Sequence, residues 1–219
     1  VHSLENVDFL VDLINKKNLI TYVACNLRFH PCLVYLKNKL EKQPQKINEI
    51  NIYCGSYLPD WRPGKNFREI YSANASMGGG VHLDLFHELD YAIWLFGFPI
   101  KSNSLVKSNS TLKIDAIDYA NYLLEYDAFV VNIVLNYYRR KAKRQIEMVF
   151  ENQTITVDLI KNTITDDEDV VLFEDKSFSV LNTYTSQLEY FINCLKENNS
   201  TMNSFENSIQ TLKICLHNE

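Results

Sequence analysis

The segment Gly78–Gly97 reads GGGVHLDLFHELDYAIWLFG and holds the residues best suited to chemistry. We expect a helix from Asp84, in which about 100° of rotation per residue places Asp84 and His87 on one side while Asp90 points away. An imidazole transfers protons near neutral pH, and a nearby carboxylate orients it and raises its basicity. Three preceding glycines let the backbone approach a ligand closely. The spacing therefore predicts an acid/base site with His87 and Asp84 as catalytic residues.

The same segment allows plainer and different interpretations. A helix with a solvated polar face would show the same pattern. His82, Asp84 and His87 also resemble a metal-ligand cluster, which would suit a metal-dependent hydrolase. His87-Glu88 begins like the zinc motif HExxH, but Tyr91 stands where the second histidine should be, so we expect no metal. A non-catalytic assembly module remains a further alternative.

Four residues outside this segment are candidates for substrate binding. Arg28 could grip a carboxylate or phosphate, because guanidinium binds both in a bidentate manner, or it could form an ion pair at a domain junction. Trp61, Arg62 and Tyr71 fall in a loop-like stretch interrupted by prolines and a glycine. Aromatic faces and forked donors suit a polyol pocket, although ordinary loop packing would use the same residues.

The six glycines of the chain do not form a dinucleotide fingerprint. No GxGxxG and no P-loop occurs, so these 219 residues contain no recognisable cradle for a pyrophosphate.

Four stretches together resemble the Gfo/Idh/MocA oxidoreductases. Asn26–Pro31 is similar to the Asn-x-Arg-x-x-Pro that follows the last strand of the family's nucleotide domain. Ser56–Arg62, with Arg68 and Tyr71, is similar to the substrate-side loop. Gly78–Gly97 is similar to the glycine-Asp-His helix, and Tyr184–Leu195 to a helix near the end of the chain. The Asp-to-His spacing is three residues here, whereas many relatives have four.

The resemblance implies an NAD- or NADP-dependent enzyme that exchanges hydride with a secondary hydroxyl of a sugar, sugar derivative or polyol. It assigns acid/base catalysis to His87, orientation to Asp84 and a cofactor contact to Asn26. The family's Glu-Lys-Pro lysine normally precedes the first helix of this chain, so we expect these residues alone to be inactive.

Two domains are expected. Val7, Leu10, Val11 and Ile14 mark a helix, and Leu19–Cys25 reads as a short buried strand. The resemblance identifies residues 1–25 as the remnant of a Rossmann domain. Residues 26–219 would then form the C-terminal substrate-binding and oligomerisation domain.

Beyond about residue 103 the apolar period changes to two, as in the strand Phe129–Tyr138. Successive short strands indicate a largely antiparallel sheet with helices on one face, and hence an α+β fold. Val130, Val134 and Tyr138 make the even-numbered face of this strand mixed rather than polar. That face suits a homo-oligomer interface, unless the two C-terminal helices cover it.

Composition excludes several partners. The formal net charge of -5 disfavours nucleic acid, and the longest apolar run, Ala128–Leu135, is too short for a membrane span. The five cysteines are scattered and form no CxxC pair, which disfavours a disulfide framework or a zinc site. Without a recognisable signal segment, a cytoplasmic enzyme acting on a small sugar-like molecule is expected.

Overall fold

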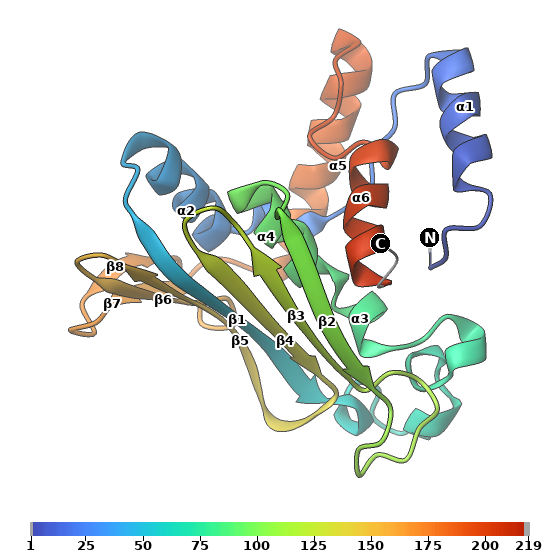
Figure 1. The fold of residues 1–219 in the computed structure, drawn as a ribbon, viewed down its shortest axis with the longest axis horizontal. Helices are drawn as coiled ribbons and strands as arrows, with labels where there is room; N and C mark the ends of the chain where they lie inside the picture. The colour runs from blue at the N-terminus through green and yellow to red at the C-terminus, as the bar shows by residue number, and fades with distance from the viewer. Residues whose placement is uncertain (1, 217–219) are drawn as a thin grey trace.

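The computed structural model describes residues 2–216 as one eight-stranded sheet with helices on one side (Figure 1). The strands are β1 (Ile47–Tyr57), β2 (Lys101–Lys107), β3 (Tyr119–Glu125), β4 (Val130–Asn136), β5 (Tyr138–Phe150), β6 (Thr154–Asp158), β7 (Thr163–Asp166) and β8 (Val171–Glu174). The α-helices are α1 (Val7–Lys17), α2 (Pro31–Lys42), α3 (Val81–Asp84), α4 (Phe86–Phe96), α5 (Val180–Glu197) and α6 (Phe205–Cys215). Short 3-10 turns are η1 (Asn26–Phe29), η2 (Leu58–Asp60), η3 (Phe67–Glu69), η4 (Tyr71–Ala73) and η5 (Ala75–Met77).

The sheet order is β2-β3-β4-β1-β5-β6-β7-β8. Every neighbouring pair is antiparallel except β1 and β4, which run parallel with Ile52 opposite Ile133. The α+β fold with a largely antiparallel sheet is therefore confirmed.

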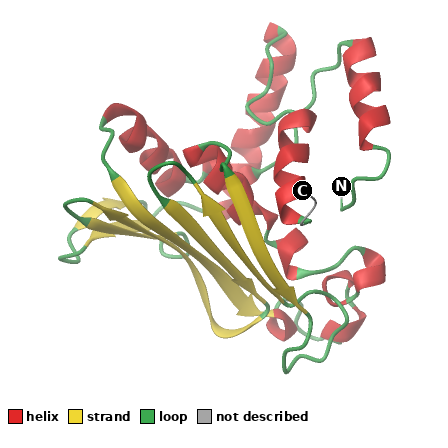
Figure 2. Ribbon diagram, in the orientation of Figure 1, coloured by secondary structure: helices red, strands yellow, loops and turns green. Residues whose placement is uncertain are grey.

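Alternation along the strands decides which face is buried. Val131, Ile133 and Leu135 of β4 are fully buried, and α2, α4 and α6 lie on their side of the sheet (Figure 2). The Tyr122 hydroxyl of β3 donates to the Cys215 carbonyl of α6 over 2.9 Å, which ties the last helix to this face. Val130 keeps 39% of its surface exposed on the opposite face. The idea that the C-terminal helices cover the even-numbered residues is wrong.

The N-terminal segment differs from its prediction in one respect. Helix α1 forms, but Leu19–Cys25 is not a strand. A strand needs a neighbouring strand to pair with. Here the Val23 N–H donates to the Asn203 carbonyl over 2.9 Å, and the Asn203 side chain returns a hydrogen bond to Val23.

The helix expected from Asp84 is interrupted. Asp84 ends α3, Leu85 has φ −107° and ψ 31°, and α4 starts at Phe86. The break changes the direction of the chain between Asp84 and His87, so a single helical wheel does not describe their relation.

All five cysteines are buried and unpaired. Within residues 2–216, no helix is long and apolar enough to cross a membrane.

Candidate active site

Asp84 is half-buried and held by a tyrosine. Its Oδ2 accepts a 2.6 Å hydrogen bond from the hydroxyl of Tyr137, whose side chain is fully buried. Burial, followed by the negative charge of Asp84, raises the pKa of Tyr137 far above its usual value. Tyr137 therefore stays a neutral donor and fixes the carboxylate without cancelling its charge.

Trp61 supports Tyr137 from the loop after β1. The two rings meet edge to face with centroids 5.3 Å apart. The Trp61 Nε1–H donates to the Ser56 hydroxyl over 2.8 Å, which anchors the indole to the end of β1. Trp61 thus acts on Asp84 through Tyr137.

Tyr71 and Arg62 extend the same cluster. Burial, followed by the negative charge of nearby Asp84, raises the pKa of Tyr71. The Arg62 guanidinium carbon lies 5.3 Å from the centre of the Tyr71 ring. The structure therefore gathers Asp84, Trp61, Arg62 and Tyr71 at one end of the sheet.

Gly79 joins this cluster to the glycine segment. A Cβ at Gly79 would lie 2.0 Å from the Tyr71 carbonyl oxygen and 2.8 Å from that of Asn74. Glycine is needed because the backbone packs against the loop that carries Tyr71. Gly79 thus serves close packing between the glycine segment and this loop.

His87 lies in a separate cavity of about 300 Å³, and Asp84 does not line it. Its lining residues are His2, Val23, Ala24, Cys25, Leu83, Phe86, His87, Phe205, Ser208, Ile209 and Leu212. The His87 Nδ1 is buried and makes no hydrogen bond within residues 2–216. Burial lowers the pKa of His87, so the ring is neutral at pH 7. A neutral imidazole with a spare buried nitrogen is suited to proton transfer.

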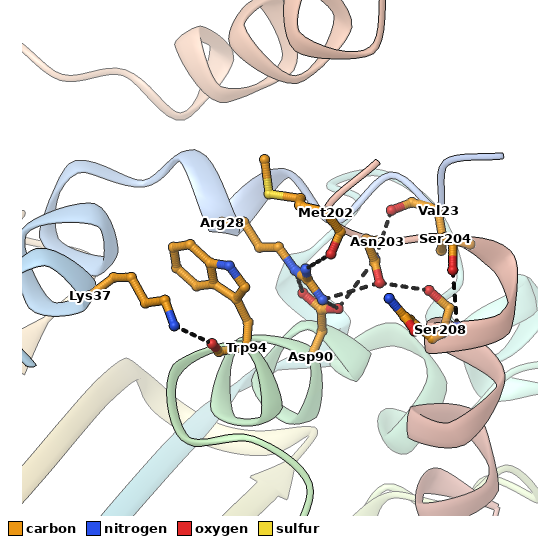
Figure 3. A network of polar contacts seen from close by, with 10 residues as sticks. Val23, Arg28, Lys37, Asp90, Trp94, Met202, Asn203, Ser204 and Ser208 are labelled. Carbon is orange, nitrogen blue, oxygen red and sulfur yellow. Dashed lines mark hydrogen bonds and ion pairs between the residues drawn. The ribbon is translucent and has the colours of Figure 1, made fainter. Parts of the chain in front are cut away.

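Arg28 is engaged inside the protein (Figure 3). Its Nε and Nη2 donate to the two carboxylate oxygens of Asp90 over 2.9 and 2.8 Å, Nη1 donates to the Met202 carbonyl, and Nη2 also to Asn203. Only 6% of Arg28 and 1% of Asp90 is exposed. Asp90, expected to point away, is instead the partner that fixes Arg28, so this arginine forms the buried ion pair expected as the alternative to a substrate contact.

Asn26 has a similar structural position. Its Nδ2 donates to the Thr183 hydroxyl over 2.7 Å, and Thr183 in turn donates to the Val180 carbonyl. Asn26 and Arg28 therefore tie η1 to the C-terminal part of the chain.

A second buried ion pair gives no signal in the sequence. Glu88 is fully buried, and its Oε1 lies 2.6 Å from the Arg144 Nε of β5. The partners are 56 residues apart in the sequence. Only the tertiary structure shows that this carboxylate supports α4 on the sheet.

His82, Asp84 and His87 do not form a metal site. Within residues 2–216, no three His, Cys, Asp or Glu side chains are arranged to hold a metal ion. The ligand set needed by the hydrolase alternative is not assembled.

The sequence matches the model of one protein family. A model described as the GFO/IDH/MocA C-terminal domain matches residues 44–156, just over half of the chain. The chain therefore belongs to the Gfo/Idh/MocA oxidoreductase family.

Solved structures share this fold at low sequence identity. UDP-N-acetylglucosamine 3-dehydrogenase from Acidithiobacillus ferrooxidans is 17% identical, with TM-score 0.75, and the match covers 98% of this chain and 65% of that one. Aldose-aldose oxidoreductase from Caulobacter crescentus, complexed with glycerol, is 12% identical over 100% and 67% of the chains, with TM-score 0.81. Levoglucosan dehydrogenase with NADH and levoglucosan is 15% identical over 100% and 69%, with TM-score 0.82.

These likenesses establish the fold alone. The chain spans about two thirds of the length of the structures it matches. No curated protein sequence matches it.

Proposed function

We propose that the chain is the substrate-side part of a longer nicotinamide-dependent oxidoreductase that oxidises or reduces a secondary hydroxyl of a sugar-like molecule. The observation that carries the proposal is His87, a neutral, half-buried imidazole that lines a cavity and has a buried Nδ1 without a partner in residues 2–216. The tyrosine-held Asp84 lies at the end of the preceding helix. Family membership and neighbours that act on UDP-N-acetylglucosamine and levoglucosan support it.

The cofactor is not held by these residues alone. Gly79 packs on the Tyr71 loop, and no glycine-rich phosphate loop occurs in the sequence. NAD or NADP, which would exchange the hydride, is therefore proposed to bind mainly to a dinucleotide domain outside these 219 residues. Residues 1–25 would be the last part of that domain, and residues 26–219 the substrate domain.

Within this chain, His87 would exchange the proton of the reacting hydroxyl. Its neutral state at pH 7 suits removal of that proton during oxidation. Asp84 would accept a hydrogen bond from a sugar hydroxyl, while Tyr137 and Trp61 hold its orientation. Precise placement of this kind supplies much of the rate of a two-substrate reaction.

The full-length enzyme provides the test. With a sugar substrate and NAD or NADP, absorbance of the reduced nicotinamide should change, and His87→Ala should lower kcat by about 10²- to 10⁴-fold. His30→Gln is the matched control because His30 is buried away from this cavity and hydrogen-bonds Leu159. Equal rates for His87→Ala and the parent enzyme would contradict the proposal.

We also propose that the open sheet face joins two copies of the chain. Leu123 and Val130 are 44% and 39% exposed there. Asn121 donates to Asn132 over 2.7 Å on this face, and Glu49 and Glu125 stand opposite Val130 on the two neighbouring strands. A two-fold, self-complementary contact is the simplest use of such a face.

A further inference from the structure

We propose that the substrate carries an anionic group, a phosphate or a carboxylate, and that Arg62 and Lys65 bind it beside Asp84. The term substrate rests on the proposed function. The anion site itself depends only on this chain and can be tested without turnover.

The local sequence brings the two cations together. Arg62-Pro63-Gly64-Lys65 forms a turn in which the Lys65 N–H donates to the Arg62 carbonyl over 3.1 Å. Proline fixes φ at the second position, and Gly64 adopts φ +79° at the third, as a type II turn requires. The Cα atoms at the two ends of such a turn lie within about 7 Å of each other, so both cationic side chains start from one short, exposed segment.

Arg62 is also directed by an aromatic ring. Its guanidinium lies over Tyr71, which lies near Asp84. Stacking uses the flat face of the guanidinium and leaves its in-plane N–H groups available. Those donors match a carboxylate or phosphate in a bidentate manner. Tyr71 therefore lies under an arginine with spare donors, and both residues line one cavity.

The charges at this turn are not neutralised within the protein. Neither Arg62 nor Lys65 forms an ion pair with another residue in the range 2–216. Glu69 accepts a 2.8 Å hydrogen bond from Asn66 and lines the same cavity, so its carboxylate offsets part of the positive charge there and leaves a net charge of one sign. In a chain with net charge -5, two adjacent unpaired cations form a local positive site.

A cavity is present where such a group would lie. It measures about 560 Å³ and is lined by Arg62, Lys65, Asn66, Glu69, Tyr71 and Met77, among others. Tyr71 borders it on the side of Asp84. A sugar-like molecule with one hydroxyl hydrogen-bonded to Asp84 can thus place a charged substituent in the cavity that Arg62 and Lys65 line. A neutral polyol would leave those cations without a partner, whereas an anion would relieve their mutual repulsion.

The experiment uses the 219-residue chain and four ligands with one hexose skeleton: glucose, glucuronate, glucose 6-phosphate and UDP-glucose. Calorimetry measures affinity, and amide NMR shifts of Gly64 and Lys65 report the position. We expect at least one anionic ligand to bind about tenfold or more tightly than glucose, with shifts at the turn. Binding should weaken as salt is added, because exposed charges are screened.

The ligand series separates the two sources of negative charge. Tighter binding of glucuronate would identify a sugar acid as the substrate class. Tighter binding of the phosphorylated ligands would identify a sugar phosphate or a nucleotide sugar. Arg62→Gln with Lys65→Gln should remove the preference. Lys16→Gln with Lys17→Gln on α1 makes the same change in net charge and should leave it intact.

Equal affinity for glucose and every anion, or anion binding unaffected by the Arg62 and Lys65 substitutions, would overturn the proposal. In the full-length enzyme, the same double substitution should raise KM for the anionic substrate about ten- to hundredfold with a smaller change in kcat. Anion binding in an enzyme without nicotinamide turnover would reject the proposed reaction and retain the anion site.

Discussion

Two carboxylates six residues apart have opposite surroundings. Asp90 is 1% exposed and shares both oxygens with Arg28, so its charge is cancelled inside the protein. Asp84 is half-buried and bound by the neutral Tyr137, so its charge is retained. An arginine partner makes an acid part of the framework, whereas a tyrosine partner fixes an acid and leaves it able to bind a ligand.

Two histidines, His30 and His87, show a similar contrast. Burial lowers the pKa of both imidazole rings, so both are neutral at pH 7. His30 has a bond at each nitrogen, from the Cys32 N–H to Nδ1 and between Nε2 and the Leu159 carbonyl. His87 has a buried Nδ1 without a partner in residues 2–216, and it lines a cavity. Saturated hydrogen bonding marks a structural ring, and a spare nitrogen marks a candidate catalyst.

The largest effect should follow loss of the buried ion pair. Arg28→Met leaves the Asp90 carboxylate buried without its partner, and we expect the free energy of unfolding to fall by about 3–5 kcal/mol. Urea denaturation measures it. Lys176→Met is the control, because Lys176 is 82% exposed and its pair with Glu174 is worth under about 1 kcal/mol. A loss of unfolding free energy no greater than that of the control would contradict the structural role assigned to the Arg28–Asp90 pair.

Acid should destabilise the chain through His30. Burial lowers the pKa of His30 to about 4, whereas the unfolded ring keeps its usual value near 6.5. Between these values only the unfolded chain binds the proton, so this contribution is complete above pH 6.5 and is lost as pH falls toward 4. We expect about 2 kcal/mol less stability at pH 5 than at pH 7. His30→Gln should flatten the profile measured by urea denaturation; an unchanged slope would show that other groups cause it.

Removal of the Tyr137 hydroxyl should have a smaller effect on stability. Tyr137→Phe breaks one hydrogen bond to Asp84 and should cost about 1 kcal/mol in urea denaturation. In the full-length enzyme, Tyr137→Phe should lower kcat, but it should add little to the loss already caused by Asp84→Asn, because Tyr137 acts through that carboxylate. Additive losses of rate in the double variant would indicate that Tyr137 acts independently.

The smallest change in stability should come from the open sheet face. Leu123→Lys places a charge on an exposed position and should alter the free energy of unfolding by no more than about 0.5 kcal/mol. It should nevertheless shift the mass measured by light scattering from dimer to monomer. Ser102→Lys, on an exposed residue of the edge strand β2, serves as control. A parent chain that is monomeric at every concentration would remove the proposed interface.

Local patterns in the sequence determined the class of fold. The period of two in β3 to β6, the apolar positions of α1 and the turn residues specify strands and helices because each depends on neighbours only a few residues away. The chemical types at Asp84, His87, Trp61 and Tyr71 were visible for the same reason. The Arg62-Pro63-Gly64-Lys65 turn is equally local, since proline and glycine carry the required backbone angles themselves.

Only the tertiary structure decided which of these polar residues are partnered. Arg28 and Asp90 are 62 positions apart, Asp84 and Tyr137 are 53 apart, and Glu88 and Arg144 are 56 apart. No sequence period predicts such pairs, because they depend on how α4 rests on the sheet. The break at Leu85 likewise separated Asp84 from His87, although an ideal helix would align them. Residue types set the available chemistry, and long-range packing determined which groups were used to hold the fold and which remained free to act.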